Sequence, residues 1–237
     1  RSFPGSKTGT LAARLAHNLL QQVVRHCQYG IDLHTGAYGR INMPQLRVDF
    51  TTPGAKKFAL SFNTPVVIDS KQRDGSLRQA ASDLGIPLLV YEGGEALRYN
   101  ELCIRAGVNG ILNVLKYLKM LKIKKYSATK KINPVITNTS SWVRAPASGL
   151  VQPIGDVLSR QVEKGTVLAH IHDPFLINPS VKVITPFKGI VIGKALKIMA
   201  TEGDALFHIA RFKKLSKVRA SIEVLREEIM DAQLDQT

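Results

Sequence analysis

The sequence predicts an α/β fold in which a mostly parallel or mixed sheet is flanked by helices and followed by a small all-β barrel or sandwich. Three observations support this prediction: helix-like and strand-like patterns alternate in the first half, its strands are nearly all apolar, and the second half contains a repeat. Continuous apolar strands between helices are typical of sheets that are covered on both faces. With 237 residues, 44% of them hydrophobic, the chain can bury one large core or two smaller ones.

Apolar spacing and cap residues divide the first half, residues 1–126, into the elements of one α/β domain. Ser6 or Thr8 can cap a helix that runs to about Gln28. One face of this helix carries apolar residues at a four-residue spacing: Leu11, Leu15, Leu19 and Val23. The other expected elements are strands at 30–34, 65–68 and 86–91, and helices at 76–84 and about 100–121.

The second half contains an internal repeat. A stretch rich in Ser, Thr, Asn and Lys, residues 127–141, predicts a linker in front of it. The two copies match at two places, residues 145–151 with 185–191 and residues 165–171 with 203–209. Half repeats that each combine a glycine turn with an apolar strand predict a pseudo-symmetric β barrel or sandwich over residues 142–211, similar to the lipoyl and biotinyl carrier domains.

The last segment, residues 212–237, predicts an amphipathic helix. Its apolar residues recur at spacings of three and four: Leu215, Val218, Ile222, Leu225, Ile229 and Ala232. Such a face packs on the body of the protein or on a second subunit, so a homo-oligomer is left open.

The net charge of +15 is concentrated in a lysine run over residues 116–131 that meets no acidic residue. A basic field of this kind attracts nucleic acid, anionic lipid or anionic substrates, and it is also typical of a solvated helix end that enters a linker. Tyr117 and Tyr126 are its only aromatic residues, so a stacking platform for nucleic acid is not expected. No apolar run is long enough for a membrane span.

The two cysteines, Cys27 and Cys103, are isolated from each other and predict reduced thiols and a cytoplasmic protein. Because the chain opens on Arg1 rather than Met, the sequence leaves a targeting segment open.

Two titratable residues stand at the ends of predicted strands. His34 ends the strand at 30–34, and Glu92 follows the strand at 86–91; glycine follows within two residues of each of them. Ligands of open α/β sheets bind beyond the carboxyl ends of the strands, so both side chains are expected at one rim. Asp32 lies two residues before His34, on the same side of its strand, where it can orient the imidazole.

The order of several motifs resembles the succinylglutamate desuccinylase/aspartoacylase family. The resemblance runs from about residue 1 to residue 210 and rests on these segments: Arg1-Ser2-Phe3-Pro4-Gly5, Ile31-Asp32-Leu33-His34-Thr35-Gly36, the following loop Arg40-Ile41-Asn42-Met43-Pro44, Asp74-Gly75-Ser76-Leu77-Arg78, and Leu89-Val90-Tyr91-Glu92-Gly93-Gly94-Glu95. The repeated β unit is similar to the family's second domain.

This resemblance implies a zinc-carboxypeptidase-like fold and a hydrolase that cleaves an amide bond of a small, anionic N-acyl amino acid. It implies that His34 is one of three protein ligands of Zn²⁺, that Glu92 moves the proton of the attacking water, and that Arg1 pairs with a substrate carboxylate. Arg40 and Arg98 are weaker candidates for lining the substrate pocket, with solvated surface as the alternative.

The sequence departs from the family at the other two zinc ligands. The family's His-x-x-Glu motif has no counterpart, because no histidine of this chain is followed three residues later by Glu. We expect that motif upstream of Arg1.

Two other functions stay open at this point. A non-enzymatic carrier built on the β unit would use Lys197 as a modified lysine. A nucleic-acid-binding protein would use the lysine run, and it is the less expected of the two.

Overall fold

The computed structural model describes residues 2–121, 132–212 and 215–234, with side chains as far as residue 227. Within this part of the chain, one mixed sheet of nine strands runs through the molecule. Its path follows the order β1 (Gly30–His34), β4 (Leu88–Glu95), β2 (Arg40–Val48), β11 (Gly189–Ala195), β13 (Ala205–Ala210) and β6 (Ser140–Arg144). Three strands pair beside this path: β3 (Val66–Asp69) on β2, β5 (Val135–Thr137) on β3, and β8 (Gln161–Val162) on β11.

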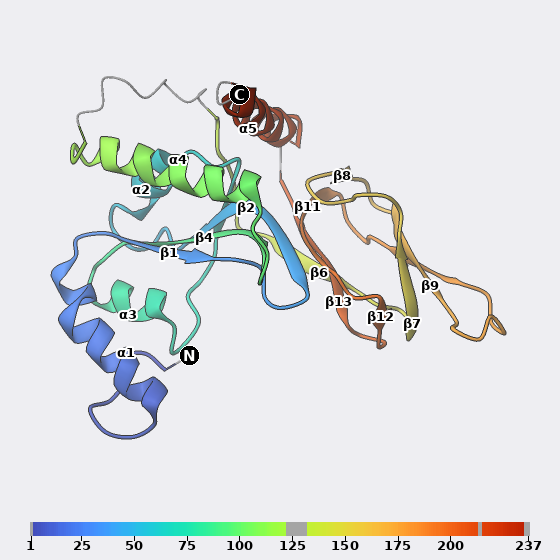
Figure 1. The fold of residues 1–237 in the computed structure, drawn as a ribbon, viewed down its shortest axis with the longest axis horizontal. Coiled ribbons are helices and arrows are strands. Elements are labelled where there is room, and N and C mark those ends of the chain that lie inside the picture. The colour runs from blue at the N-terminus through green and yellow to red at the C-terminus, as the bar shows by residue number, and fades with distance from the viewer. Residues whose placement is uncertain (1, 122–131, 213–214, 235–237) are drawn as a thin grey trace.

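Helices cover both faces of the first half of the sheet (Figure 1). On one face lie α1 (Leu11–Gln22), the short 3₁₀ helix η1 (Val24–His26) and α3 (Leu77–Asp83). On the other lie α2 (Ala55–Phe62) and α4 (Glu101–Tyr117). The C-terminal helix α5 (Leu215–Leu234) joins their core through Leu225, and its residues from Leu215 to Ile222 pack in a separate cluster with Val66 and Ile68 of β3. The predicted α/β fold with a sheet flanked by helices is therefore confirmed, and the sheet is mixed rather than parallel.

Side-chain caps set the starts of the helices. Ser76 accepts a hydrogen bond from the Gln79 amide at 3.1 Å, and Asn100 accepts one from the Cys103 amide at 3.0 Å. These caps begin α3 and α4 close to the predicted positions. The first helix is capped by Thr10 instead of Ser6 or Thr8, and it ends at Gln22, where the chain tightens into η1.

The buried face of α1 differs from the apolar face that the sequence suggested. Ala16 and Leu20 of α1 are buried together with Val24 of η1, whereas the face formed by Leu11, Leu15, Leu19 and Val23 is exposed. Both faces recur at helical spacing, and the periodicity alone does not decide which of them meets the sheet.

The segment that the sequence analysis treated as a loop, Arg40 to Pro44, is the first half of the long strand β2. Pro44 disfavours a regular strand because it lacks an N–H group. The strand accommodates it at a register shift against β4, which falls between Asn42 and Gln45. This correction brings β2 into the middle of the sheet, beside both β4 and β11.

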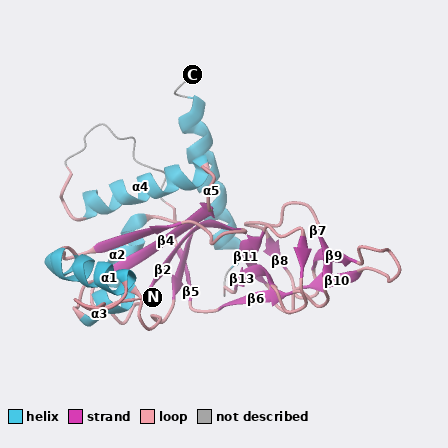
Figure 2. Cartoon of the chain, turned by 60° about the horizontal axis from the view of Figure 1, so that its bottom comes forward, coloured by secondary structure: helices cyan, strands magenta, loops and turns pink. Residues whose placement is uncertain are grey.

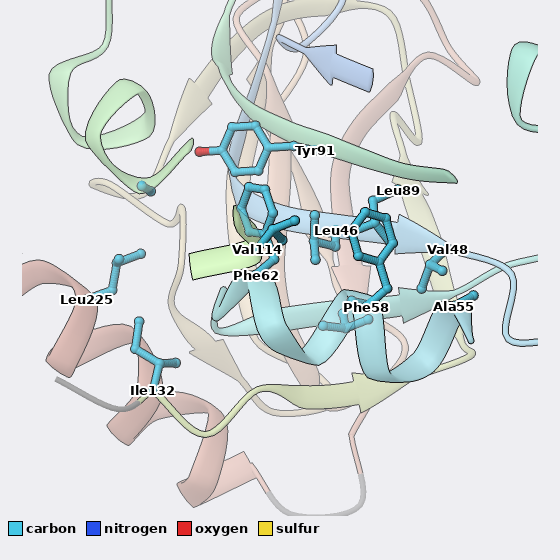
Figure 3. Close-up of a cluster of buried hydrophobic side chains, with 13 residues drawn as sticks. Leu46, Val48, Ala55, Phe58, Phe62, Leu89, Tyr91, Val114, Ile132 and Leu225 are labelled. Atoms are coloured by element: carbon cyan, nitrogen blue, oxygen red, sulfur yellow. The ribbon is translucent and has the colours of Figure 1, made fainter. Parts of the chain in front are cut away.

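The main core lies between the sheet and the helices α2, α4 and α5 (Figure 3). Phe58 and Phe62 of α2 are each 1% exposed, and the Phe62 ring stacks on Tyr91 of β4 at 5.4 Å between centroids. Leu225 of α5 closes the same cluster, so the C-terminal helix packs on the body of this chain. The sequence predicted that this helix packs either on the body of the protein or on a second subunit, and the contact of Leu225 confirms the first.

The repeat forms two antiparallel hairpin-like pairs. β7 (Gly149–Pro153) pairs with β9 (Val167–His172), just as β11 pairs with β13. β7 and β9 belong to a second, four-stranded sheet with β10 (Val181–Ile184) and β12 (Met199–Ala200). This sheet shares a separate apolar core with β6, β11 and β13 (Figure 2).

The two copies of the repeat are tied together by reciprocal backbone hydrogen bonds. The Gly165 amide donates to the Thr185 carbonyl at 2.9 Å, and the equivalent Gly203 amide donates to the Ala145 carbonyl at 2.9 Å. Each copy thus closes its glycine turn on the start of the other copy, which explains why the sequence repeats at these positions.

The predicted linker is corrected at its C-terminal end. Val135–Thr137 form β5, which pairs in parallel with β3, and β6 begins at Ser140. Residues 122–131 lie outside the described part of the chain. Because β2 and β11 also pair directly, the sheet runs without a break from the first half into the second, and the boundaries at 126 and 142 stay a prediction.

Among the described residues, no helix is both long and apolar enough to cross a membrane.

Candidate active site

Strand β4 separates two kinds of surface by the alternation of its side chains. Leu89 and Tyr91 point into the core under α2 and α4, whereas Leu88 and Val90 pack toward α1 and α3. Glu92 follows the second set, since alternate residues of a strand share a face. We call the side of the sheet that carries Glu92 the polar face.

The structure brings His34 and Glu92 side by side, as the sequence predicted. β1 and β4 are parallel, and His34 is the register partner of Glu92. Glu92 is not at a strand end, however, because β4 continues to Glu95 through its pairing with Ile41 of β2.

Asp32 holds the imidazole of His34 from the same strand. Its Oδ2 lies 2.9 Å from His34 Nε2. The hydrogen bond to Asp32 is the largest cause that raises the pKa of His34, and partial burial opposes it. The expected orienting role of Asp32 is therefore matched by the geometry, with Nε2 as the ring nitrogen that is engaged.

Two side chains of β2 contact the carboxylate of Glu92. Asn42 Nδ2 donates to Glu92 Oε2 at 2.6 Å, and Arg47 Nε lies 3.1 Å from Glu92 Oε1. Among the described residues, the Arg47 Nε–H is not aligned with any acceptor, so this contact is an ion pair without an aligned hydrogen bond. The side chains of Arg47 and Glu92 are only 23% and 19% exposed, which limits the screening of their attraction by water.

Positive charge accumulates around this carboxylate. Arg78 of α3 is held by Ser70 Oγ at 3.1 Å and by the Lys71 carbonyl at 2.9 Å. Burial lowers the pKa of Arg78, and the neighbouring charges of Arg47 and Arg73 lower it further. Guanidinium groups gathered in this way favour an anionic ligand beside Glu92.

Sequence reasoning missed Asn42, Arg47 and Arg78 as site residues. Arg78 ends the segment Asp74-Gly75-Ser76-Leu77-Arg78, which resembles a family motif but carries no local signal of a role in the site. Asn42 and Arg47 were hidden because their segment was not recognised as a strand. The polar residues Gln45 and Arg47, spaced two apart among apolar neighbours, are the signal that could have shown it.

The arginines that the sequence did select lie elsewhere or outside the described residues. The Arg40 guanidinium stacks over the Trp142 ring at 4.6 Å, and Trp142 in turn stacks on His208 at 4.7 Å. Arg98 is 78% exposed and lies 3.8 Å from Glu95. Arg1 lies outside the described residues.

A cavity of about 560 Å³ lies largely on the other side of the sheet, under α4. Its walls are mainly apolar and include Tyr91, Ile104 and Val108, and it reaches the candidate site only at His34. Glu92 does not line it. The candidate site is therefore the polar face around Glu92, and this cavity is a separate feature.

A zinc site is not completed by the residues that the structure describes. Among them, no three His, Cys, Asp or Glu side chains are grouped so that they could hold a metal ion. Catalytic zinc takes three protein ligands, and His34 fits as one of these because a carboxylate orients its ring. Two further ligands are required from outside this group.

Lys197 and the lysine run are the features that suggested a carrier and a nucleic-acid-binding protein. Lys197 Nζ forms an ion pair with Asp204 Oδ2 at 2.7 Å. Of the lysine run, Lys116 and Lys119 are described, and the residues from 122 to 131 are not. Both cysteines are free thiols, with Cys27 exposed and Cys103 buried.

Fold and site together define an α/β protein that carries a histidine and a glutamate side by side on parallel strands, among arginines. The model of the succinylglutamate desuccinylase/aspartoacylase catalytic domain matches residues 1–118. The chain belongs to the succinylglutamate desuccinylase/aspartoacylase family. The comparison with curated proteins gave no significant match.

Solved structures of the family share the fold across both halves of the chain. A succinylglutamate desuccinylase/aspartoacylase from Rhodobacter sphaeroides is 23% identical with a TM-score of 0.76, covering 89% of this chain and 66% of that one. The ectoine utilization protein EutE from Ruegeria pomeroyi is 21% identical with a TM-score of 0.77, covering 89% and 68%. An aspartoacylase family protein from Mesorhizobium loti is 18% identical with a TM-score of 0.74, covering 90% and 66%. This chain thus spans about two thirds of their length.

Proposed function

We propose that the chain is the larger part of a zinc-dependent hydrolase that cleaves the amide bond of a small N-acyl amino acid. The observation that supports it most directly is the pairing of His34 with Glu92 on neighbouring parallel strands. Family membership supports the same chemistry, because the names of its members describe removal of acyl groups from amino acids.

His34 is the zinc ligand that this part of the chain contributes, and Asp32 fixes its ring. When bound, zinc makes a coordinated water acidic enough to react with an amide near neutral pH. Glu92 accepts the proton of that water and returns it to the leaving amine. The carboxylate is suited to this task because it lies beside His34 and is only partly exposed.

The arginines of the polar face bind the anionic part of the substrate. The charge of Arg47 is neutralised by its ion pair with Glu92. Arg78 and Arg73 add positive charge that remains for the substrate. Arg1 keeps the carboxylate-binding role that the family resemblance implies. The Trp142 stack holds Arg40 at the N-terminal end of β2, whereas the exposed Arg98 lies beside Glu95 in the lining of the apolar cavity and not on the polar face.

The same proposal extends to the fold. The part of the mixed sheet formed by β1 to β5 corresponds to a zinc-carboxypeptidase-like domain, and strands β6 to β13 correspond to a small β domain of lipoyl-like half repeats. The reciprocal hydrogen bonds of Gly165 and Gly203 support the second part, because related halves make equivalent contacts.

Two substitutions in the full-length protein separate the proposed roles. Glu92→Ala is expected to abolish release of free amine from N-succinylglutamate and N-acetylaspartate while leaving bound zinc almost unchanged. His34→Ala is expected to lose zinc and activity together, because it removes a ligand. Glu95→Ala, on the same strand but at the apolar cavity, is the matched control and is expected to keep both.

Each contrary result has a distinct meaning. If Glu92→Ala loses zinc as completely as activity, Glu92 is a ligand and not the proton carrier. If the full-length protein binds no zinc and cleaves neither amide, the proposed hydrolase is wrong.

A further inference from the structure

The carboxylate of Glu92 is oriented by a side chain that depends, in turn, on a glycine of the C-terminal half. Asn42 is only 8% exposed, and its Nδ2 donates the 2.6 Å hydrogen bond to Glu92 Oε2. On its other side, β2 pairs with β11, and the register partner of Asn42 is Gly193. In β4 the register partner of Asn42 is Gly94, and its side chain reaches across the register shift to Glu92, so the contacts from Glu92 through Asn42 to Gly193 cross three neighbouring strands.

Gly193 leaves the space that the Asn42 amide occupies. A Cβ atom added at Gly193 would lie 2.5 Å from Asn42 Oδ1, and the next nearest atom would be the Ile41 carbonyl oxygen at 3.3 Å. A methyl group at this position thus meets the end of one side chain before it meets any backbone. The Asn42 amide is the group that has to move, and moving it breaks its hydrogen bond to Glu92.

We propose that Asn42 is a positioning residue for the proton carrier Glu92, and that Gly193 of β11 keeps Asn42 in place. Through this pair, the C-terminal half of the chain orients a carboxylate that it does not touch. This inference rests on the proposed role of Glu92. The orientation matters because a carboxylate that transfers a proton has to point one oxygen at the reacting water. Asn42 occupies Oε2, which leaves Oε1, beside Arg47 Nε but without an aligned hydrogen bond from it, for the proton transfer.

The test is a double-mutant cycle in the full-length, zinc-loaded protein with N-succinylglutamate and N-acetylaspartate as probes. Gly193→Ala and Asn42→Ala are each expected to lower kcat between about tenfold and about a hundredfold, with KM changed by no more than about twofold. Gly193→Ala is expected to have almost no further effect when Asn42 is already Ala, because the side chain that it displaces is gone. Zinc content is expected to stay at the wild-type level in all of these variants.

Two further variants separate positioning from packing. Asn42→Asp keeps the shape but replaces the donor with a second carboxylate oxygen, so it is expected to lose at least as much kcat as Asn42→Ala. Lys194→Ala, the next residue of β11, removes an ion pair with Asp156 and is expected to leave kcat unchanged.

Equal losses from Gly193→Ala with and without the Asn42 side chain, or full activity of Asn42→Asp, would overturn this inference. So would a crystal structure of Gly193→Ala in which Asn42 still donates to Glu92, whatever the rates are. If Glu92→Ala is inactive while Gly193→Ala is normal, the positioning role alone fails. If Glu92→Ala is fully active, the proposed function fails first.

Discussion

The two faces of the central sheet differ in character: one packs into an apolar core, and the other carries a cluster of charged side chains. Tyr91 and Glu92 are consecutive in β4, yet Tyr91 lies in the core against Phe62 and Glu92 lies among Asn42 and Arg47 on the polar face. Burial raises the pKa of Tyr91, and its hydroxyl is already used in a hydrogen bond to the Cys103 carbonyl. One face thus satisfies its polar groups internally, whereas the other gathers charges and keeps unpaired polar atoms.

This difference shows where stability and chemistry reside in the molecule. The apolar face stabilises the sheet by burying large side chains, and substitutions there act on the free energy of unfolding. The polar face carries the charged groups around Glu92, and substitutions of these groups act on titration and rate.

The largest expected effect is on the apolar face. Phe62→Ala removes a side chain that is 1% exposed and stacks on Tyr91, so it is expected to cost about 3–5 kcal/mol of stability. Urea unfolding measures this loss. The hydrolysis rate per folded molecule is expected to change little, and a large fall in that rate would break the separation of the two faces.

An acid-dependent effect is expected from His208, which lies beyond Asn42 on β13. Burial, together with the charges of Arg47, Arg40 and Arg73, lowers the pKa of His208 to about 3. Between this value and the unfolded pKa near 6.5, the unfolded state binds more protons, so stability falls as the pH falls. At pH 5 the loss relative to pH 7 is about 2 kcal/mol.

His208→Phe keeps a ring against Trp142 and is expected to remove this pH dependence. Unfolding at pH 5 and pH 7 can be followed by the fluorescence of Trp142, the only tryptophan of the chain. An identical acid response in both proteins would contradict the prediction.

A smaller gain in stability is expected at Gln45. This residue is fully buried beside Glu92, and its Nε2 makes a long 3.4 Å hydrogen bond to the Ile192 carbonyl. Its Oε1 has no hydrogen-bond partner in the part of the chain that the structure describes. Gln45→Met removes the unpaired polar atom and is expected to stabilise the fold by about 1 kcal/mol. Hydrolysis is expected to slow, because a polar wall beside Glu92 is lost; a stabilised variant with unchanged rate would assign Gln45 to packing alone.

The smallest effect is expected at Asp32. Asp32→Asn removes the carboxylate that raises the pKa of His34, so this pKa is expected to fall in the metal-free protein. Protonated His34 stabilises the fold below its unfolded pKa, and this contribution is lost as the pH rises through the folded pKa; the variant therefore loses stability on the acid side. Titration of the His34 ring by NMR measures the shift, and Asp83→Asn on α3 serves as the control.

The sequence predicted the candidate site better than it predicted the strand that supports it. His34 and Glu92 could be found because each follows an apolar run and precedes glycines, which are local signals. Asn42 and Arg47 could not, because Pro44 argued against a strand and the bulge that accommodates it depends on β4. Similarly, the sequence around Val135–Thr137 predicts a polar linker. The segment forms a strand because it pairs with β3, which is distant in the chain.

Local sequence patterns predict the class of the fold, the closeness of His34 and Glu92, the repeat and the family. These features rest on short-range patterns: apolar runs, caps, glycine turns and motif order. The tertiary structure decided which face of α1 is buried, that β2 joins the two halves of the sheet, and that Asn42, Arg47 and Gly193 meet around Glu92. These contacts join residues far apart in the chain, and they form only when strand register brings them together, so no local pattern contains them.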